Sequence, residues 1–220
     1  NGETKLNHQE MDAVLKGILD AVLKSGSQKI STNAWRTAFK ASMEAYLGKL
    51  PESFEYNGKR YTPRTFADEM GLNPDDYIEI TSFSHRPFYK KMLLEVPDNW
   101  VWDANCYNVP LDDFISVIDL ALASGFTVAW AADVSEKTFS HKNGLAIIPE
   151  KDFSEMSQAE KDSLYITPVK DKTITQEIRQ EGFDNFTTQD DHGMHIVVSV
   201  KDQTGKKYYI VKNSWGLKSN

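Results

Sequence analysis

The sequence has few cysteines, no long apolar runs and a deficit of basic residues, and each of these absences excludes a class of protein. It contains one cysteine, Cys106, among 220 residues, so an internal disulfide is impossible and nothing indicates an oxidising compartment. No apolar run approaches the roughly 20 residues that a membrane-spanning helix requires. Basic residues are outnumbered, with 25 Lys and Arg against 32 Asp and Glu. Because a nucleic-acid-binding surface needs clustered basic residues, we expect binding to neither nucleic acid nor membrane.

Patterns typical of metal sites and of export are also missing. The five histidines show neither the HExxH spacing nor a His/Cys ligand pattern, so we expect no metal and no other cofactor. The first residues are polar rather than an apolar signal sequence, which favours a cytoplasmic location. The chain begins with Asn1 instead of Met, which indicates a processed or cut chain.

Hydrophobic residues make up 40% of the sequence, enough for a sizeable core. Their spacing predicts an α+β fold in two parts, a helical part over residues 1–100 and a β-rich part over residues 101–220. The expected helices begin after Asn7, after Asn33, at Thr62-Pro63, at Pro110 and at the Ser157 capping box. The expected strands cover residues 77–81, 126–132, 194–200 and 206–211.

The last two predicted strands carry the most informative residues. The linker between them has Gly205 at a turn position that needs a positive φ, so an antiparallel hairpin is expected. His195 lies near the start of the first strand and Asn213 lies just after the second, at the same end of the ladder. An Asn oxygen that accepts from one imidazole N–H orients the ring and leaves the other nitrogen to exchange a proton with a nucleophile. Trp215 would shield that hydrogen bond from water.

Other assignments of these polar residues stay open. His192 is expected in a loop, with a role as the base in place of His195 as the alternative. Asp190 and Asp191 suit local turns, the commonest use of Asp in a loop, or a position near a substrate amine. Asn108 suits either a cleft wall or the loop that leads into the helix at Pro110.

Several stretches resemble one family of enzymes. The segment GMHIVVSVKDQTGKKYYIVKNSWG resembles the His and Asn strands of papain-like cysteine peptidases. Four more stretches resemble the bleomycin hydrolase/aminopeptidase C branch, namely TTQDDHGMHIV, FTVAWAADV, YTPRTFADEMGLNPDDYIEITSF and HRPFYKKMLLEVPDNW. The resemblance runs from about Asn7 to Gly216, and its most specific part is KNSWG after a His-bearing strand.

The resemblance implies a papain-like cysteine peptidase fold, with a helical insertion over residues 1–100 and the antiparallel His/Asn lobe over residues 101–220. It implies an aminopeptidase that removes N-terminal residues from peptides through a thiol acyl-enzyme. At the matching positions His195 would be the catalytic base, Asn213 would orient it, and Trp215 would cover the pair. The family also assembles as homo-hexamers, so a homo-oligomer is expected.

The sequence departs from the family in one important respect. The glycine-flanked Cys motif that supplies the nucleophile and the Gln of the oxyanion hole have no counterpart here, so the chain resembles an incomplete C-terminal portion whose partner would be an N-terminal Cys lobe. Cys106 is expected to be structural, because nearby acidic residues disfavour a thiolate and free Cys is usually buried. The alternative to an enzyme is a binding or scaffold module without a nucleophile.

Overall fold

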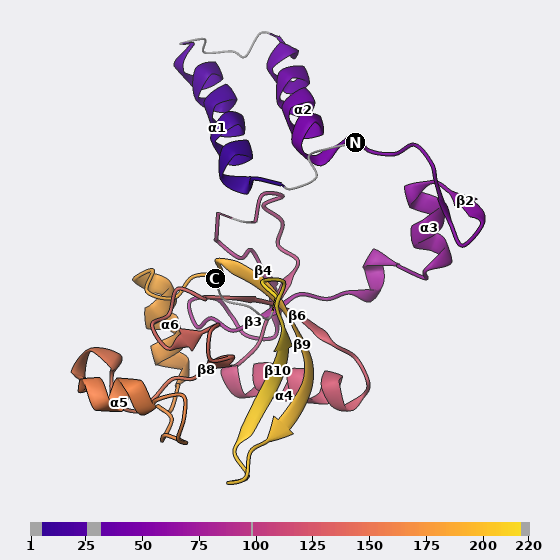
Figure 1. Ribbon diagram of the computed structural model, residues 1–220. Helices are drawn as coiled ribbons and strands as arrows, with labels where there is room; N and C mark the ends of the chain where they lie inside the picture. Colours follow the sequence, from indigo (N-terminus) through magenta and orange to yellow (C-terminus); the bar gives the residue numbers. More distant parts are fainter. Residues whose placement is uncertain (1–5, 26–31, 98, 217–220) are drawn as a thin grey trace. The chain divides into compact units, whose positions relative to one another are not determined.

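The computed structural model describes residues 6–25, 32–97 and 99–216, which form two units that divide between Tyr77 and Ile78 (Figure 1). The sequence pattern places the boundary later, after residue 100. The difference arises because residues 80–81 and 90–92 pair with residues 106–108 in one sheet, so this segment belongs to the second unit. Within the described ranges, every helix is too short or too polar to cross a membrane.

The first unit contains the helices that the capping residues predict. They are α1 (His8–Lys24), α2 (Ala34–Leu47) and α3 (Pro63–Glu69). The 3-10 helix η1 (Pro74–Asp76) follows and was not predicted. The Asn7 side chain accepts a hydrogen bond from the Glu10 N–H at 3.2 Å, and the Thr62 hydroxyl caps α3 in the same way. These bonds satisfy N–H groups that a helix start leaves without a partner, so α1 and α3 begin where expected.

A short hairpin in the first unit has no counterpart in the sequence prediction. It pairs β1 (Phe54–Tyr56) with β2 (Lys59–Tyr61) around Asn57 and Gly58, whose φ values are 50° and 74°. Asn-Gly is the pair that favours a two-residue turn with positive φ at both positions. The Phe66 ring of α3 packs edge-on against the hairpin, with centroids 5.2 to 5.3 Å from those of Phe54, Tyr56 and Tyr61.

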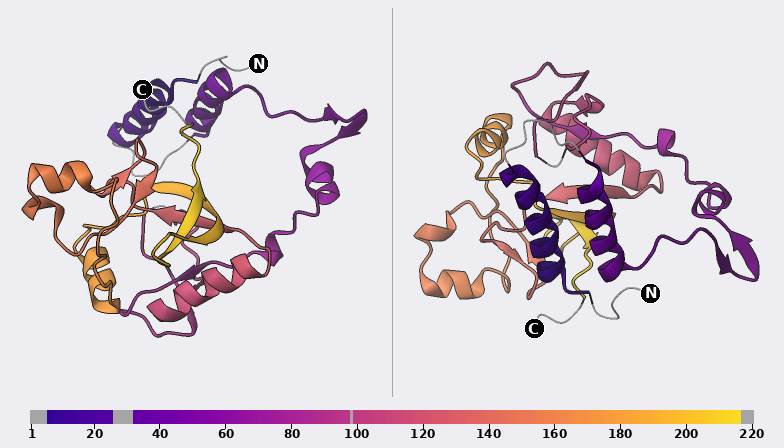
Figure 2. Two further views of the ribbon diagram at one scale, coloured as in Figure 1. Left: turned by 60° about the horizontal axis from the view of Figure 1, so that its bottom comes forward. Right: turned by 90° about the horizontal axis from the view of Figure 1, so that it is seen from above.

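The second unit is built around a three-stranded antiparallel sheet. Its strand order is β10 (Lys207–Lys212), β9 (His192–Lys201) and β6 (Val128–Ala132). Helix α4 (Leu111–Ala123) contacts β6 and β9, buries Ile118, and runs beside the sheet in Figures 1 and 2. The Asp119 carboxylate of α4 also accepts from the Lys207 amine at 2.6 Å and the Tyr209 hydroxyl at 2.7 Å.

Smaller elements complete the second unit, which is α+β as the sequence predicts. A second sheet has the order β3 (Ile80–Thr81), β5 (Cys106–Asn108), β4 (Lys90–Met92); the remaining elements are β7 (Phe139–Ser140), β8 (Leu145–Ala146), η2 (Phe153–Glu155), α5 (Gln158–Ser163) and α6 (Gln176–Asp184). The capping box of Ser157 and Glu160 at the start of α5 is confirmed. Leu164 forms a buried cluster with Ile147 and Met156.

One extra residue interrupts the β9–β10 ladder. From the turn, the pairs run regularly from Lys207 with Lys201 to Ile210 with Val198. The next pair is Val211 with Ile196, so Val197 is an extra residue, which is the definition of a β-bulge. Without the bulge, the regular register would place Asn213 opposite His195. With it, Lys212 is opposite His195, and Asn213 falls on the other face of the sheet.

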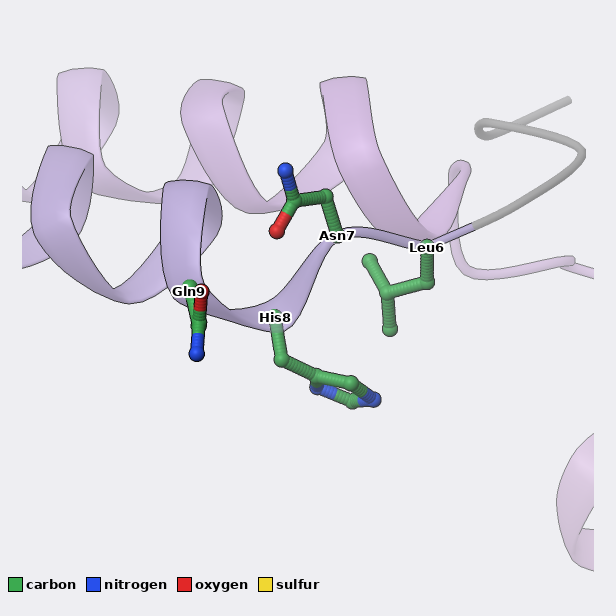
Figure 3. Close-up of a pocket in the computed structure, with 4 residues that line it drawn as sticks. All are labelled: Leu6, Asn7, His8 and Gln9. Carbon is green, nitrogen blue, oxygen red and sulfur yellow. The ribbon is translucent and has the colours of Figure 1, made fainter. Parts of the chain in front are cut away.

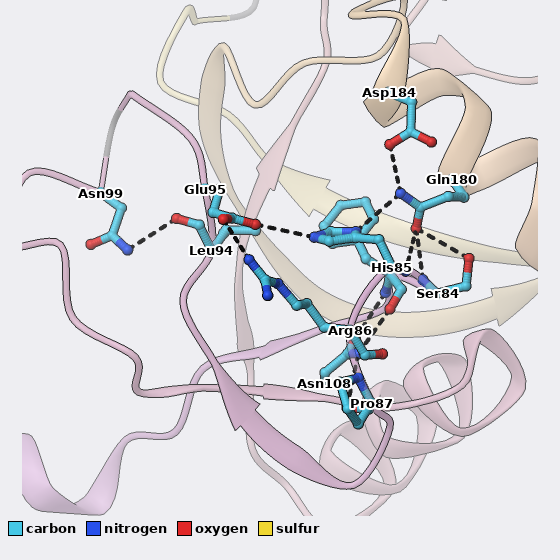
Figure 4. A network of polar contacts seen from close by, with 11 residues as sticks. Ser84, His85, Arg86, Pro87, Leu94, Glu95, Asn99, Asn108, Gln180 and Asp184 are labelled. Atoms are coloured by element: carbon cyan, nitrogen blue, oxygen red, sulfur yellow. Dashed lines mark hydrogen bonds and ion pairs between the residues drawn. The ribbon is translucent and has the colours of Figure 1, made fainter.

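Buried amide side chains hold the loop between β3 and β4 (Figure 4). The fully buried Asn108 accepts from the Phe83 N–H at 2.8 Å and donates to the carbonyls of Phe83, Arg86 and Pro87. Gln180 of α6 accepts from the backbone N–H groups of Ser84 and His85 at 2.6 and 3.3 Å. Asn108 therefore supports this loop. Its hydrogen bonds account for its burial, so a role in lining a cleft is not needed to explain it.

Asn108→Ala should destabilise the second unit, because the Phe83 N–H and the carbonyls that Asn108 satisfies would be buried without partners. We expect a loss of about 2–4 kcal/mol in the free energy of unfolding. Asn105→Ala is the matched control, since Asn105 is exposed and bonds to other exposed side chains. Urea unfolding followed by circular dichroism measures both variants, and equal midpoints for the two would contradict the assigned role.

Candidate active site

A histidine and an asparagine meet at the open end of the β9–β10 ladder. His192 is the first residue of β9, and Asn213 follows the last residue of β10. The His192 Nε2 atom lies 2.9 Å from the Asn213 Oδ1 atom, and both residues are half-buried. His192 shares its strand face with Met194 and Ile196, which are buried, so the imidazole lies on the inner face of the sheet.

The hydrogen bonds of Asn213 determine the tautomer of His192. The Asn213 Oδ1 atom also accepts from the backbone N–H of Ser214 at 2.7 Å, which orients the amide with its oxygen toward the imidazole. An oxygen accepts only, so His192 Nε2 must carry the proton in this contact. The neutral ring then has an unprotonated Nδ1, which is the atom able to take a proton from another group.

Trp215 lies against this pair. Its ring centroid is 4.6 Å from that of His192, with the planes tilted by 36°. Gly216 follows with φ 80°, a conformation that suits glycine. Trp215 is 44% exposed and contacts the His192 ring, so the indole covers part of the imidazole. The sequence predicts that Trp215 covers the catalytic histidine, and in the structure the ring that Trp215 contacts is that of His192.

Two aspartates hold the start of β9 against the end of β6. Asp133 accepts from the Gln189 N–H at 2.9 Å, and Asp191 accepts from the Val134 N–H at 3.0 Å. The segment after β6 supplies the acceptor of the first bond and the segment before β9 supplies the acceptor of the second. Both segments adjoin the paired residues Ala132 and His192. Asp191 therefore joins two segments that are distant in sequence, rather than closing the local turn expected for it, and this bond helps to fix the backbone that carries His192.

The predicted contact between His195 and Asn213 is wrong. The His195 Nε2 atom lies 2.6 Å from the Thr127 hydroxyl, and the side chain is exposed on the outer face of the sheet. The reason is the bulge at Val197, which shifts the register by one residue and so exchanges the two faces. His192, expected in a loop, is part of β9 and takes the place beside Asn213.

His141 lies in the turn between β7 and β8, and nothing in the sequence indicated that it would reach the site. Its ring centroid lies 5.2 Å from that of Trp215 in an edge-on arrangement. Spacing along the chain gave no signal for this contact, because it joins a turn to a residue far along the sequence. His85 is likewise held by Gln180 and by Glu95, as Figure 4 shows, and belongs to the loop support rather than to the site.

A separate pocket of about 560 Å³ lies in the first unit, lined by Leu6, Asn7, His8 and Gln9 (Figure 3). The lining comes from one stretch of chain at the start of α1. His8 is its single titratable lining residue, and Asn7 is already engaged in capping the helix. This lining lacks the paired side chains that proton transfer to a nucleophile requires, so the His192 pair is the better candidate.

The single cysteine is placed as a structural residue. Cys106 is 4% exposed within β5, paired with Met92 of β4. Burial, together with the charges of Glu79 and Asp103, raises the pKa of the thiol to about 11. A thiol in this environment is protonated near neutral pH and is a poor nucleophile.

Cys106 should therefore resist alkylation in the folded chain. Iodoacetamide or a papain-type epoxide is expected to leave it unlabelled near neutral pH, because both reagents require an accessible thiolate. Mass spectrometry measures the adduct, and the same reaction in guanidinium chloride serves as the positive control. Stoichiometric labelling of the folded chain would show that the thiol is reactive.

The Asp133 clamp predicts a pH dependence of stability. Burial opposes the charge, but hydrogen bonds from Ser135 and from the backbone N–H groups of Gln189, Ser135 and Glu136 together lower the pKa of the carboxyl. A group with a lowered folded pKa stabilises the fold above its unfolded pKa and loses that effect as the pH falls through the folded pKa. Asp133→Asn should thus lower the urea midpoint near neutral pH, and the difference from the unchanged protein should narrow as the pH falls below the ordinary pKa of an aspartate. A difference independent of pH would contradict this account.

Comparison with known proteins identifies a shared fold. Neither the family models nor the curated proteins give a match. Among solved structures, PepW from Lactobacillus rhamnosis HN001 (DR20) is similar, with a TM-score of 0.58 and 21% sequence identity. The alignment covers 94% of this chain and 47% of the PepW chain, so this chain spans about half the length of PepW. At this identity the similarity shows a shared fold.

Proposed function

We propose that this chain provides the base and the orienting residue of a cysteine-type aminopeptidase of the bleomycin hydrolase/aminopeptidase C type. His192 is the base and Asn213 orients it. The hydrogen bond between His192 Nε2 and Asn213 Oδ1, beneath Trp215, carries the proposal. The fold shared with PepW, a peptidase, supports the same class.

The geometry suits a thiol acyl-enzyme mechanism. His192 Nδ1 takes the proton of a cysteine thiol, and the thiolate attacks the carbonyl carbon of the peptide bond. The imidazolium then gives that proton to the leaving amine as the C–N bond breaks, which leaves a thioester. Water, deprotonated by His192, attacks the thioester and releases the acid and the thiol. Asn213 keeps Nδ1 directed at the nucleophile throughout.

The nucleophilic thiol comes from another segment under this proposal. Cys106 lies buried in β5, with a pKa raised to about 11. The alignment with PepW leaves more than half of that chain unmatched, which is ample length for a second lobe. The substrate is a peptide, and its N-terminal residue is the one removed.

The two histidines of β9 provide the test, because they lie close in sequence and on opposite faces. The native polypeptide that contains this chain should hydrolyse aminoacyl nitroanilides. His192→Ala should lower kcat by about 10²–10⁴-fold, the usual contribution of a general base. The matched control His195→Ala should stay within a few fold, because His195 contacts Thr127 on the outer face.

The outcomes separate three interpretations. Loss of activity in His195→Ala with activity kept in His192→Ala would reverse the assignment of the base. A native polypeptide that binds peptides without turnover, and in which His192→Ala changes nothing, would favour the scaffold module. Activity unaffected by thiol reagents would contradict the thiol mechanism itself.

A further inference from the structure

Trp215 is held by three rings, and two of them come from one hairpin. His192 lies on one side of the indole, at 4.6 Å between centroids. Phe139 and His141 approach edge-on, at 6.0 and 5.2 Å with interplanar angles of 80° and 78°. Aromatic pairs favour this edge-on arrangement at such separations, so each contact contributes to holding the indole. His141 is the nearer of the two.

The hairpin that carries these two rings is well anchored. Strands β7 and β8 pair antiparallel, and the His141 carbonyl accepts from the Gly144 N–H at 3.1 Å across the turn. Asn143 Nδ2 also donates to the Ser140 hydroxyl at 2.8 Å. Leu145 of β8 packs against the buried Leu164 cluster. The core thus fixes the turn, and the turn fixes the half-buried imidazole of His141.

We infer that His141 is a positioning residue that holds Trp215 over the hydrogen bond between His192 and Asn213. Its catalytic meaning rests on the proposed function, but the contact itself does not. Trp215 is 44% exposed, so much of its surface has no packing around it, and the ring contacts with Phe139 and His141 limit its rotation. An indole free to rotate would admit water to His192 Nε2–H, and water competes with Asn213 for that proton.

The test follows the Nε2 proton of His192, which does not require a nucleophile. In a chain labelled with ¹⁵N-histidine, this proton should exchange slowly with water and show a contact to Asn213. His141→Ala should speed the exchange by about tenfold or more, because opening of the cover becomes frequent. His141→Phe should restore slow exchange, since it returns an aromatic ring to the turn. Lys142→Ala, at the exposed neighbouring position, should leave the rate unchanged.

The results distinguish this inference from the proposed function. Slow exchange that His141→Ala does not change would overturn the role of His141 while leaving the role of His192 intact. Rapid exchange in the unchanged chain would also overturn it, because no cover would then exist. Equal acceleration by His141→Ala and Lys142→Ala would indicate a general loosening of the turn. Activity retained by His192→Ala would reject the proposed function whatever the exchange rates show.

Discussion

The register of the β9–β10 ladder decides which histidine can meet Asn213. Side chains alternate between the two faces of a strand, so one extra residue exchanges the faces of everything beyond it. Val197 is that residue, and it places Met194 and Ile196 in the interior together with His192. The buried area of the two apolar residues stabilises this register, because a slip would expose both of them. The position of His192, the candidate base, is thus set by the packing of Met194 and Ile196 further along the same strand.

Polar side chains supplement a small apolar core in the second unit. Asn108 and Gln180 satisfy backbone groups of the loop between β3 and β4, and Asp133 and Asp191 join the ends of β6 and β9. Such bonds are directional, whereas apolar contact is not, so they fix positions that packing alone would leave adjustable. The candidate site lies next to Asp133 and Asp191, at the end of the sheet that these two residues hold together.

Local signals in the sequence predicted the longer helices and strands, with the exception of α6, and missed most of the short ones. Asn7, Thr62 and Ser157 start helices where their side chains cap them, and Gly205 takes the positive φ expected at the hairpin turn. Asn213 and Trp215 do meet a histidine, but it is His192, which the sequence placed in a loop, and not His195 of the expected strand. The identity of that histidine depended on a bulge, which local propensity does not encode. The contact of His141 depended on the packing of a distant hairpin, so nothing in its neighbours along the chain indicated it.

Strand β10 is an edge strand of the central sheet, which affects how readily two copies of the chain associate in concentrated solution. Among the described residues β10 pairs on one side, with β9, so its other side offers backbone groups to any extended peptide. Lysines lie at both ends of this strand, Lys207 and Lys212, and in the ranges that the structure describes Lys207 forms an ion pair with Asp119. Pairing of two such strands would bring the lysines of two chains together, and charged residues of this kind oppose edge-to-edge association. The strand that leads into Asn213 thus carries its own protection against pairing with a second copy.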